Sequence, residues 1–315
     1  MKISIVILNY NSWSMANNAI DSILNSQTSH SVSIVTVDNN STIAPDEVIL
    51  RDIKRKSTAY IESKSNRGYS SGNNIGIKFS LEQGCDLLII ANPDVTFDPS
   101  AIAELAAFLE ENPKYGIAGP TIVNSSGSMQ PIVMGEEISL SRKYMALLNK
   151  ASCGVLFKRF SKKNYRKDVC VNDSFDVYIP SGCCLAIHRR AFEWVFPLDE
   201  NVFLYLEEYI IAKKLAPSRL RSRVVGSAHL THQWGYSTKG IGLKALGSLA
   251  FSEFYYFRKY HNKNIIELLP LLILRVCQMF RRQKQEGRDL SEIRGLARRV
   301  YLSIRTKNDG YFLTK

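Results

Sequence analysis

The sequence predicts an α/β protein built around a mostly parallel β-sheet that is flanked by helices. Two observations support this fold class. Apolar, β-rich runs alternate with helical patterns through the first 120 residues, and each run is separated from the next by enough chain for a crossover helix. The chain of 315 residues is 45% hydrophobic and 22% charged, which is enough to bury a full core.

The first half of the chain supplies the regular alternation. Met15, Ala19, Ile20 and Ile23 share one helical stripe, and Gly84 closes a later helix that opens at a glycine-rich turn. Strands are therefore predicted at residues 3–10, 33–38, 58–63, 85–91 and 116–122, with helices at 14–27, 68–84 and 100–111.

The second half is less regular. Residues 141–167 carry nine Lys or Arg and no acidic residue, so we expect a basic insertion or mobile loop there. A strand bent at residues 180–182, a helix over 203–215 and one or two strands over 219–235 are predicted to follow. We expect a catalytic domain at 1–240 and a basic helical tail at 241–315.

Charge and cysteine placement narrow the function classes. The net charge is +12, but residues 241–315 hold 15 Lys or Arg against 6 acids, which leaves only +3 for the first 240 residues. A nucleic-acid partner is therefore not expected. The spacing of the six cysteines along the sequence does not suit a metal site, and we interpret them as reduced thiols. The first 13 residues fit neither a signal peptide nor a spanning helix, so we expect a cytoplasmic protein.

Polar residues stand at four predicted strand ends or helix entries. Ligands of parallel sheets bind beyond the carboxyl ends of the strands, so these positions are candidate binding residues. Each one alone would usually be a turn or a helix cap. The four groups are Asn9 to Asn11, Asp38 to Ser41, Asn66 to Tyr69, and Asn92 to Asp94.

Two of these four groups are suited to binding a nucleotide. Asp38 could accept hydrogen bonds from a ribose or base, and the turn from Asn66 to Gly68 precedes a helix N-terminus that favours a diphosphate. The sequence contains neither GxGxxG after the first strand nor GxxxxGK[ST]. Dinucleotide oxidoreductases and P-loop enzymes are therefore disfavoured.

A second cluster contains carboxylates and histidines. Glu207 and Glu208 lie in an apolar helical pattern, so burial would raise the pKa of at least one of them toward that of a general base. The simpler alternative is a solvated helix face with a Glu paired to Lys213 or Lys214. His229 or His232 could complete a metal site begun by Asp94.

Taken in order, these motifs resemble family 2 inverting glycosyltransferases of the GT-A fold, especially the rhamnosyltransferase-like branch that builds bacterial surface polysaccharides. The resemblance covers about residues 3–240. It rests on the segments SIVILNYN, VDNNS, NRGYSSGNNIGI, IIANPDV, GPTIVNSSG, PSGCCLAIHRRAF, DENVFLYLEE and HQWGYS.

The resemblance implies a role for each motif residue. Glu208 aligns with the catalytic base, although Glu replaces the usual Asp, so Glu207 remains an alternative. Asp94 and His232 would ligate Mg²⁺ or Mn²⁺, and Asn92 replaces the first Asp of the usual DxD motif. The donor-binding residues implied are Asn9, Asn11, Asp38, Asn66, Gly68, Asn73 and Asn92.

The implied reaction is a single displacement that moves a sugar from a nucleotide-sugar donor to a hydroxyl of a saccharide acceptor. The acceptor is expected to be linked to a lipid diphosphate, as in O-antigen or capsule synthesis. The basic, amphipathic stretch at residues 264–284 predicts peripheral contact with the anionic inner face of the cytoplasmic membrane, or simple packing on the catalytic domain. The tail could also support a homodimer. The rivals are a GT-A-like nucleotidyltransferase and a non-catalytic basic binding module.

Overall fold

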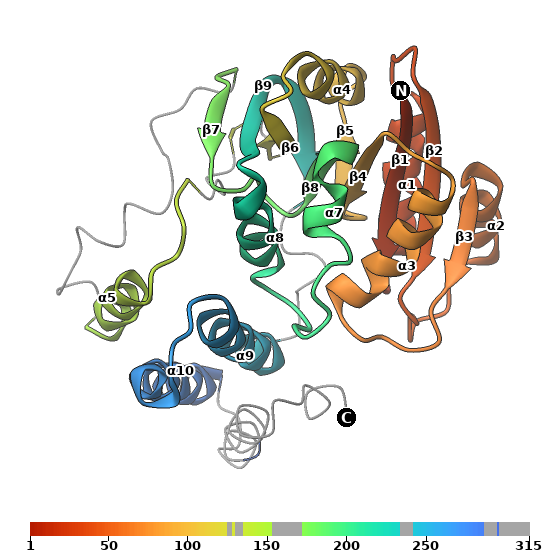
Figure 1. The fold of residues 1–315 in the computed structure, drawn as a ribbon. Coiled ribbons are helices and arrows are strands. Elements are labelled where there is room, and N and C mark those ends of the chain that lie inside the picture. The colour runs from red at the N-terminus through yellow and green to blue at the C-terminus, as the bar shows by residue number, and fades with distance from the viewer. Residues whose placement is uncertain (125–127, 130–134, 153–171, 234–241, 287–294, 296–315) are drawn as a thin grey trace.

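A computed structural model describes residues 1–124, 128–129, 135–152, 172–233, 242–286 and 295. Its described elements form one sheet with helices on both faces (Figure 1). The strands are β1 (Lys2–Asn9), β2 (Ser31–Asp38), β3 (Ala59–Glu62), β4 (Leu87–Ala91), β5 (Val95–Phe97), β6 (Tyr115–Val123), β7 (Phe175–Val177), β8 (Cys184–His188) and β9 (Arg221–His232). The longer helices are α1 (Trp13–Leu24), α2 (Glu47–Lys56), α3 (Tyr69–Glu82), α4 (Ala101–Glu111), α5 (Leu140–Ala151), α8 (Glu207–Leu215), α9 (Gly242–Tyr260) and α10 (Ile265–Glu286), and α7 (Phe192–Val195) is a single turn.

The central sheet with flanking helices confirms the fold class expected from the sequence, and its strands pair both parallel and antiparallel. The strand order is β3-β2-β1-β4-β8-β6-β9-β5, with β7 paired to β9. The first four strands of this order are parallel, as predicted, because α1, α2 and α3 provide the crossovers. β8 lies antiparallel between β4 and β6, and β5 and β7 pair antiparallel with β9. The connection between β4 and β5, residues 92–94, is too short to hold the crossover helix that a parallel neighbour needs.

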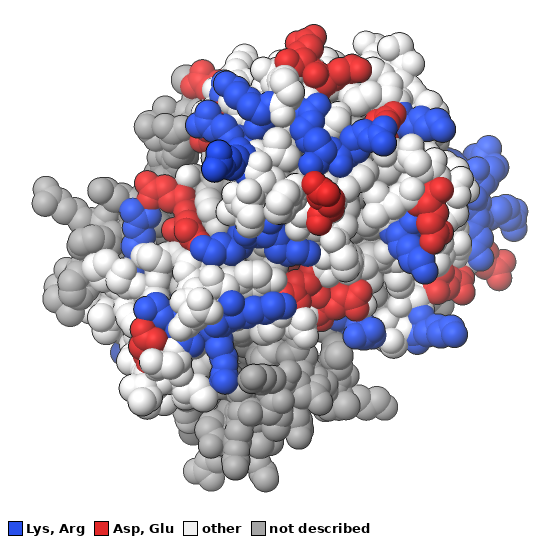
Figure 2. Space-filling view, in the orientation of Figure 1, with Lys and Arg blue, Asp and Glu red and all other residues white. Residues whose placement is uncertain are grey.

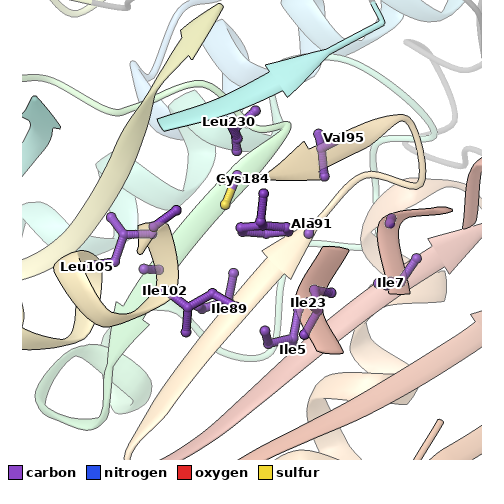
Figure 3. Close-up of a cluster of buried hydrophobic side chains, with 14 of the residues drawn as sticks. Ile5, Ile7, Ile23, Ile89, Ala91, Val95, Ile102, Leu105, Cys184 and Leu230 are labelled. Carbon is purple, nitrogen blue, oxygen red and sulfur yellow. The ribbon is translucent and has the colours of Figure 1, made fainter. Parts of the chain in front are cut away.

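The two faces of the sheet are covered by different helices because side chains alternate along each strand. Odd-numbered residues of β1, such as Ile5, pack with Ile20 of α1 and Ile102 of α4. Even-numbered residues, such as Val6, pack with Ile77 of α3 and Ile211 of α8. Figure 3 shows the first cluster, with Leu105 and Ile102 of α4 pointing toward Ile89 of β4. Both clusters are shielded from water, so the sheet forms the rigid base of the molecule.

Surface charge is mixed on the face drawn in Figure 2. Lys and Arg side chains alternate there with Asp and Glu side chains, and neither sign fills a broad area. Ion pairs among the described residues include Arg189 with Asp86 and Lys56 with Asp21. The net positive charge is therefore not collected into one basic patch on this face.

Helices α5, α9 and α10 form a third hydrophobic cluster with α8. Phe254, Tyr256 and Phe257 of α9 and Leu268 and Leu271 of α10 are buried. They pack with residues of α8 and the segment before it, which are Val202, Leu206, Tyr209 and Ile210. Residues on both sides of position 240 thus share one core.

A buried ion cluster joins the same three helices. Glu253 of α9 has no exposed side-chain surface, and its carboxylate accepts from the guanidinium of Arg275 of α10, with Arg275 Nε 2.7 Å from Glu253 Oε2. The ammonium of Lys143 of α5 pairs with the same carboxylate. Each helix therefore contributes one charge to a site from which water is excluded.

Two expectations for the second half need correction. Residues 140–151 form helix α5 and not a mobile loop, while residues 153–167 of the expected basic insertion lie outside the described residues. The helix expected over 203–215 begins only at Glu207 because Tyr205 and Leu206 are left-handed, with φ of 77° and 68°. β9 forms one strand and not two.

Candidate active site

The carboxyl ends of β1 and β2 meet as parallel pairing requires. Asn9 is the register partner of Asp38. Nδ2 of Asn9 donates to Oδ1 of Asp38 at 3.2 Å, and the hydroxyl of Ser41 donates to the same oxygen at 2.6 Å. Asn9 and Asp38 are both buried. The pair is therefore fixed in position at the sheet edge, with the Asp38 carboxylate held by its own neighbours.

The turn before α3 joins the same edge. Oδ1 of Asn66 accepts from the backbone N–H of Gly68 at 3.0 Å and from Nδ2 of Asn39 at 3.1 Å. Gly68 has φ of 100°, and a Cβ at this position would lie 2.4 Å from the carbonyl oxygen of Phe203. Both facts require glycine here. The turn thus connects the Asp38 region to the segment that leads into α8.

The other predicted donor-binding residues occupy different positions. Asn11 lies beside the first pair, and its side chain contacts the turn at Thr42 with a 3.1 Å bond from Nδ2. Asn92 lies after β4, and its backbone N–H donates to the carbonyl of Cys183 at 2.9 Å. Asn73 is buried inside α3, where Nδ2 donates to the carbonyl of Tyr69 at 3.0 Å. No described contact joins Asn73 to Asp38.

Asp94 and His232 lie together at the far end of β4. Val95 and His232 are register partners in β5 and β9, which places the preceding Asp94 next to the histidine. Nε2 of His232 is 3.4 Å from Oδ1 of Asp94, and both side chains are buried. His229 instead faces Asp98, with Nδ1 3.9 Å from Oδ2. The structure therefore separates the two histidines that the sequence left as alternatives.

A carboxylate and an imidazole are suitable donors for Mg²⁺ or Mn²⁺. Among the residues that the structure describes, no group of three or more His, Cys, Asp or Glu side chains could hold a metal. Asp94 and His232 alone would leave most of the coordination sphere to a ligand and water. This set fits an ion that is shared with a diphosphate better than a closed structural site.

The two glutamates begin α8 in different surroundings. Glu207 is only 6% exposed, and its Oε1 has no hydrogen-bond partner among the described residues. Glu208 is partly exposed. The left-handed residues Tyr205 and Leu206 come directly before the pair. Such conformations cost about 1 kcal/mol or more each and persist only where the surroundings hold them.

Glu208 packs against the loop before β8. A Cβ on Gly182 would lie 2.1 Å from Oε1 of Glu208, so only glycine leaves room for the carboxylate. The hydroxyl of Tyr69 donates to the carbonyl of Gly182 at 3.0 Å, and the N–H of Tyr69 donates to the carbonyl of Phe203 at 2.9 Å. Tyr69 therefore links the turn at residues 66–68 to the loop at Gly182 and to the segment at Phe203 that precedes α8.

Burial changes the acidity of this group of residues. Burial and then the charge of Glu208 raise the pKa of Glu207 to about 8. Burial also raises the pKa of Glu208, opposed by hydrogen bonds from the backbone of Glu208 and Gly182. Both carboxyl groups are thus more basic than a carboxylate in water, and Glu207 is protonated near neutral pH.

Cys183 lies between the Asp94 region and the Glu208 region of the site. Burial raises the pKa of its thiol to about 12, and the negative charges of Asp94 and Glu208 both add to this rise. Backbone contacts place the loop of Cys183 between the two carboxylates: the N–H of Asn92, two residues before Asp94, donates to the carbonyl of Cys183 at 2.9 Å, and the neighbouring Gly182 packs against Glu208. The thiol itself stays protonated and unreactive.

Sequence reasoning did not assign roles to Gly182, Tyr69 or Phe203. Gly182 and Tyr69 stand in the segments PSGCC and NRGYS, and the glycine was a usable signal of close backbone approach. Phe203 carries no such signal because it contributes only its carbonyl oxygen.

Comparison with known proteins concerns the family and the fold of this chain. The profile of the family described as Glycosyl transferase family 2 matches residues 4–196. N-acetylglucosaminyl-diphospho-decaprenol L-rhamnosyltransferase of Mycobacterium tuberculosis is 27% identical over 224 residues, which are 67% of this chain and 69% of that protein. Low-salt glycan biosynthesis hexosyltransferase Agl10 of Haloferax volcanii is 30% identical over 207 residues, which are 65% of this chain and 59% of that protein.

A solved structure is similar in fold. GalNAc-T7 with UDP, GalNAc and Mn²⁺ superposes with a TM-score of 0.53 at 15% sequence identity. The match covers 85% of this chain and 55% of that chain, so this chain spans about half the length of that neighbour. At this level of identity the likeness concerns the fold alone.

Proposed function

Because this chain belongs to glycosyl transferase family 2, we propose that it transfers a sugar from a nucleoside-diphosphate sugar to a hydroxyl of a saccharide acceptor with inversion at the anomeric carbon. The observation that carries the proposal is the loop at residues 182–183, which contacts Asn92 beside Asp94 on one side and Glu208 on the other, and which Tyr69 joins to the turn at residues 66–68. A metal ligand, a base and a nucleotide-binding turn are the three parts that such a transfer needs.

The donor would bind along the ends of β1 and β2 and the turn before α3. Asn9 and Ser41 orient the Asp38 carboxylate, so its remaining acceptor capacity is available to a ribose or base. Asn66 holds the Gly68 turn at the start of α3, where backbone N–H groups favour a negatively charged group. These contacts would fix the nucleotide while leaving the sugar toward Asp94.

Glu208 would remove the proton from the attacking hydroxyl. Its partly exposed position permits contact with an acceptor, and its raised pKa makes it a stronger base than a solvated glutamate. Glu207, buried and protonated near neutral pH, would hold the start of α8 without exchanging a proton with substrate. The attack takes place on the face of the sugar opposite the leaving diphosphate, so no covalent intermediate is needed.

Asp94 and His232 would hold Mg²⁺ or Mn²⁺. Such an ion, when bound, neutralises negative charge on a departing nucleoside diphosphate. Support for this part comes from the 3.4 Å approach of the two side chains and from the Mn²⁺ in the GalNAc-T7 structure.

A donor screen tests the proposed transfer. The full chain is incubated with a panel of nucleotide sugars, with Mn²⁺ or Mg²⁺, and with a lipid-diphosphate-linked saccharide. The expected result is release of nucleoside diphosphate and a product with inverted anomeric configuration by NMR. Release of inorganic diphosphate from a nucleoside triphosphate and a sugar phosphate would instead indicate a nucleotidyltransferase.

The names of two relatives support a proposal for the substrate class. One relative is named as an L-rhamnosyltransferase acting on a lipid diphosphate, and another as a glycan biosynthesis hexosyltransferase. We therefore propose a hexose or deoxyhexose donor and a lipid-linked acceptor in O-antigen or capsule-type polysaccharide synthesis. A water-soluble saccharide that served as well as the lipid-linked one would count against the lipid-linked part.

The outer face of α10 supports a peripheral place on the inner face of the cytoplasmic membrane. Leu268, Leu271 and Met279 are buried on one side of the helix. On the other side four apolar residues are exposed, namely Ile266 at 83%, Leu269 at 49%, Ile273 at 54% and Phe280 at 39%. None of the described helices is long and apolar enough to cross a bilayer.

Positive charge near the C-terminal end of α10 supports contact with an anionic bilayer. Arg281 and Arg282 are exposed directly after Phe280. Acidic lipids would attract these arginines. Each basic residue near such a surface adds on the order of 1 kcal/mol.

Vesicle flotation tests this membrane contact without donor or acceptor. Binding is expected to phosphatidylcholine vesicles that contain phosphatidylglycerol, and to weaken in high salt. The double change Ile266→Ser with Ile273→Ser should abolish it. The matched control is Leu24→Ser with Val48→Ser, which alters residues 54% and 64% exposed on α1 and α2. Equal binding to neutral vesicles, or a dimer that only the α10 changes dissociate, would contradict the proposal.

A further inference from the structure

Helix α9 contacts the segment that delivers the two glutamates. This segment, residues 198–206, starts after Pro197 and ends at the first turn of α8. It contains the left-handed residues Tyr205 and Leu206, a conformation that β-carbon-bearing residues adopt only under constraint. The constraint has to come from neighbouring elements.

The first contact is made at Asp199. Its side chain is 5% exposed, and Oδ2 accepts from Lys259 Nζ at 2.8 Å, Tyr255 Oη at 2.8 Å and Tyr260 Oη at 2.6 Å. Oδ1 accepts from the N–H of Asn201 at 3.0 Å. Burial alone would raise the pKa of Asp199, but the hydrogen bonds from Lys259, Tyr260 and Asn201 outweigh it and lower the pKa. One carboxylate is thus held by the last turn of α9 and by its own loop.

The second contact is made next to the left-handed residues. The hydroxyl of Ser252, a fully buried residue of α9, donates to the carbonyl of Leu204 at 2.9 Å. Ser252 is seven residues before Lys259 and therefore on the same side of the helix. The two contacts of α9 enclose the segment from Asp199 to Leu204, immediately before the turn that orients Glu207 and Glu208.

The opposite side of the segment is fixed by α3. The side-chain amide of Asn74 bonds both the N–H and the carbonyl of Leu198, at 2.8 and 2.9 Å. The N–H of Tyr69 bonds the carbonyl of Phe203. Without α9, the segment would keep these contacts on one side only.

We propose that α9 is a positioning element of the active site, in which Asp199 and Ser252 hold the left-handed turn at residues 205–206 and thereby aim Glu208 at the acceptor. Neither residue touches substrate in this assignment. The inference rests on the proposed transfer for its catalytic consequence, whereas the contact of α9 with the segment does not depend on that transfer.

Two single changes test the proposal. Ser252→Ala removes the bond to Leu204, and Asp199→Asn weakens the cluster around Oδ2 while keeping the shape of the side chain. The matched control is Ser248→Ala, one turn earlier on α9, where Ser248 is also buried and has no described hydrogen bond. Hydrogen–deuterium exchange of the ligand-free protein should rise for amides of residues 203–208 in the two test variants and stay unchanged in the control.

The catalytic readout separates positioning from general stability. With kcat corrected for the folded fraction, both test variants should lose about tenfold or more in kcat while the Kd for the donor nucleotide stays within about twofold. Faster exchange with unchanged kcat would overturn the proposal, and so would an equal loss of kcat in Ser248→Ala. If the wild type transfers no sugar, the proposed function fails, while unchanged exchange in the two test variants would refute the positioning role by itself.

Discussion

The carboxylate of Glu208 occupies the space that a side chain on Gly182 would need. A Cβ on Gly182 would approach Oε1 to 2.1 Å and both Cδ and Cγ to 2.7 Å. The clash falls on the movable end of a side chain and not on backbone. The fold can therefore accept alanine at this position by displacing the carboxylate.

Gly182→Ala should consequently reduce activity far more than stability. We expect kcat to fall about a hundredfold because the base is moved by roughly 1 Å, with a change in Tm of a few degrees and an unchanged donor Kd. Steady-state kinetics and calorimetry check this. In a Glu208→Gln background the same change should have little further effect, and full additivity would show that Gly182 acts through another residue.

Replacing each of the two glutamates by glutamine should change the activity to a different extent. Glu208→Gln removes the proposed base, so kcat should fall by about 10² to 10⁴. Glu207→Gln replaces a carboxyl group that is already protonated near neutral pH, so most of the activity should remain. Product formation under single-turnover conditions provides the comparison. The reverse order of effects would assign the base to Glu207.

The buried carboxyl of Glu207 should also make stability depend on pH. Its pKa is raised from 4.5 to about 8 in the folded protein. Between these values the unfolded chain releases this proton and the folded chain keeps it, so the group destabilises the fold increasingly as the pH rises. The Tm of Glu207→Gln minus that of the wild type should therefore increase as the pH rises from about 5 to about 8. Parallel Tm curves of the two proteins would contradict the assigned protonation state.

The two histidines of β9 provide a controlled test of metal binding. His232 faces Asp94, whereas His229 faces Asp98. His232→Gln should weaken Mn²⁺ binding in the presence of nucleoside diphosphate about tenfold or more, and His229→Gln should not change it. Electron paramagnetic resonance titration measures the free ion directly. Equal Mn²⁺ affinity in both variants would remove His232 from the ligand set.

Local patterns predicted most of the first half of the fold. The strand ends at Asn9 and Asp38 follow from β-rich runs that stop at polar residues, and parallel pairing brings such ends together. The same reasoning placed Asp94 beyond β4. Helix α2 was not predicted, although Asp46 caps its N-terminus by accepting from Val48 and Ile49, because its mostly polar sequence lacks a wide apolar stripe.

The parts of the fold and of the site that were not predicted depend on contacts between residues that are distant in the chain. Gly182 meets Glu208 at the start of β8, which runs antiparallel to β4 and β6, and Asp94 meets His232 because β5 runs antiparallel to β9. Short segments do not reveal strand direction. The left-handed turn at Tyr205 and Leu206 is equally hidden, since its apolar residues read as a continuous helix until α9 and α3 fix them in another conformation.

The ion cluster of Glu253, Arg275 and Lys143 determines how the helical part of the molecule can come apart. Detaching α5 or α10 alone would leave the fully buried Glu253 short of a partner, which is strongly unfavourable in an apolar setting. Opening of these helices should therefore be concerted, and a shortened chain that ends between α9 and α10 should aggregate rather than fold. The C-terminal helices are in this sense an all-or-none unit of the enzyme.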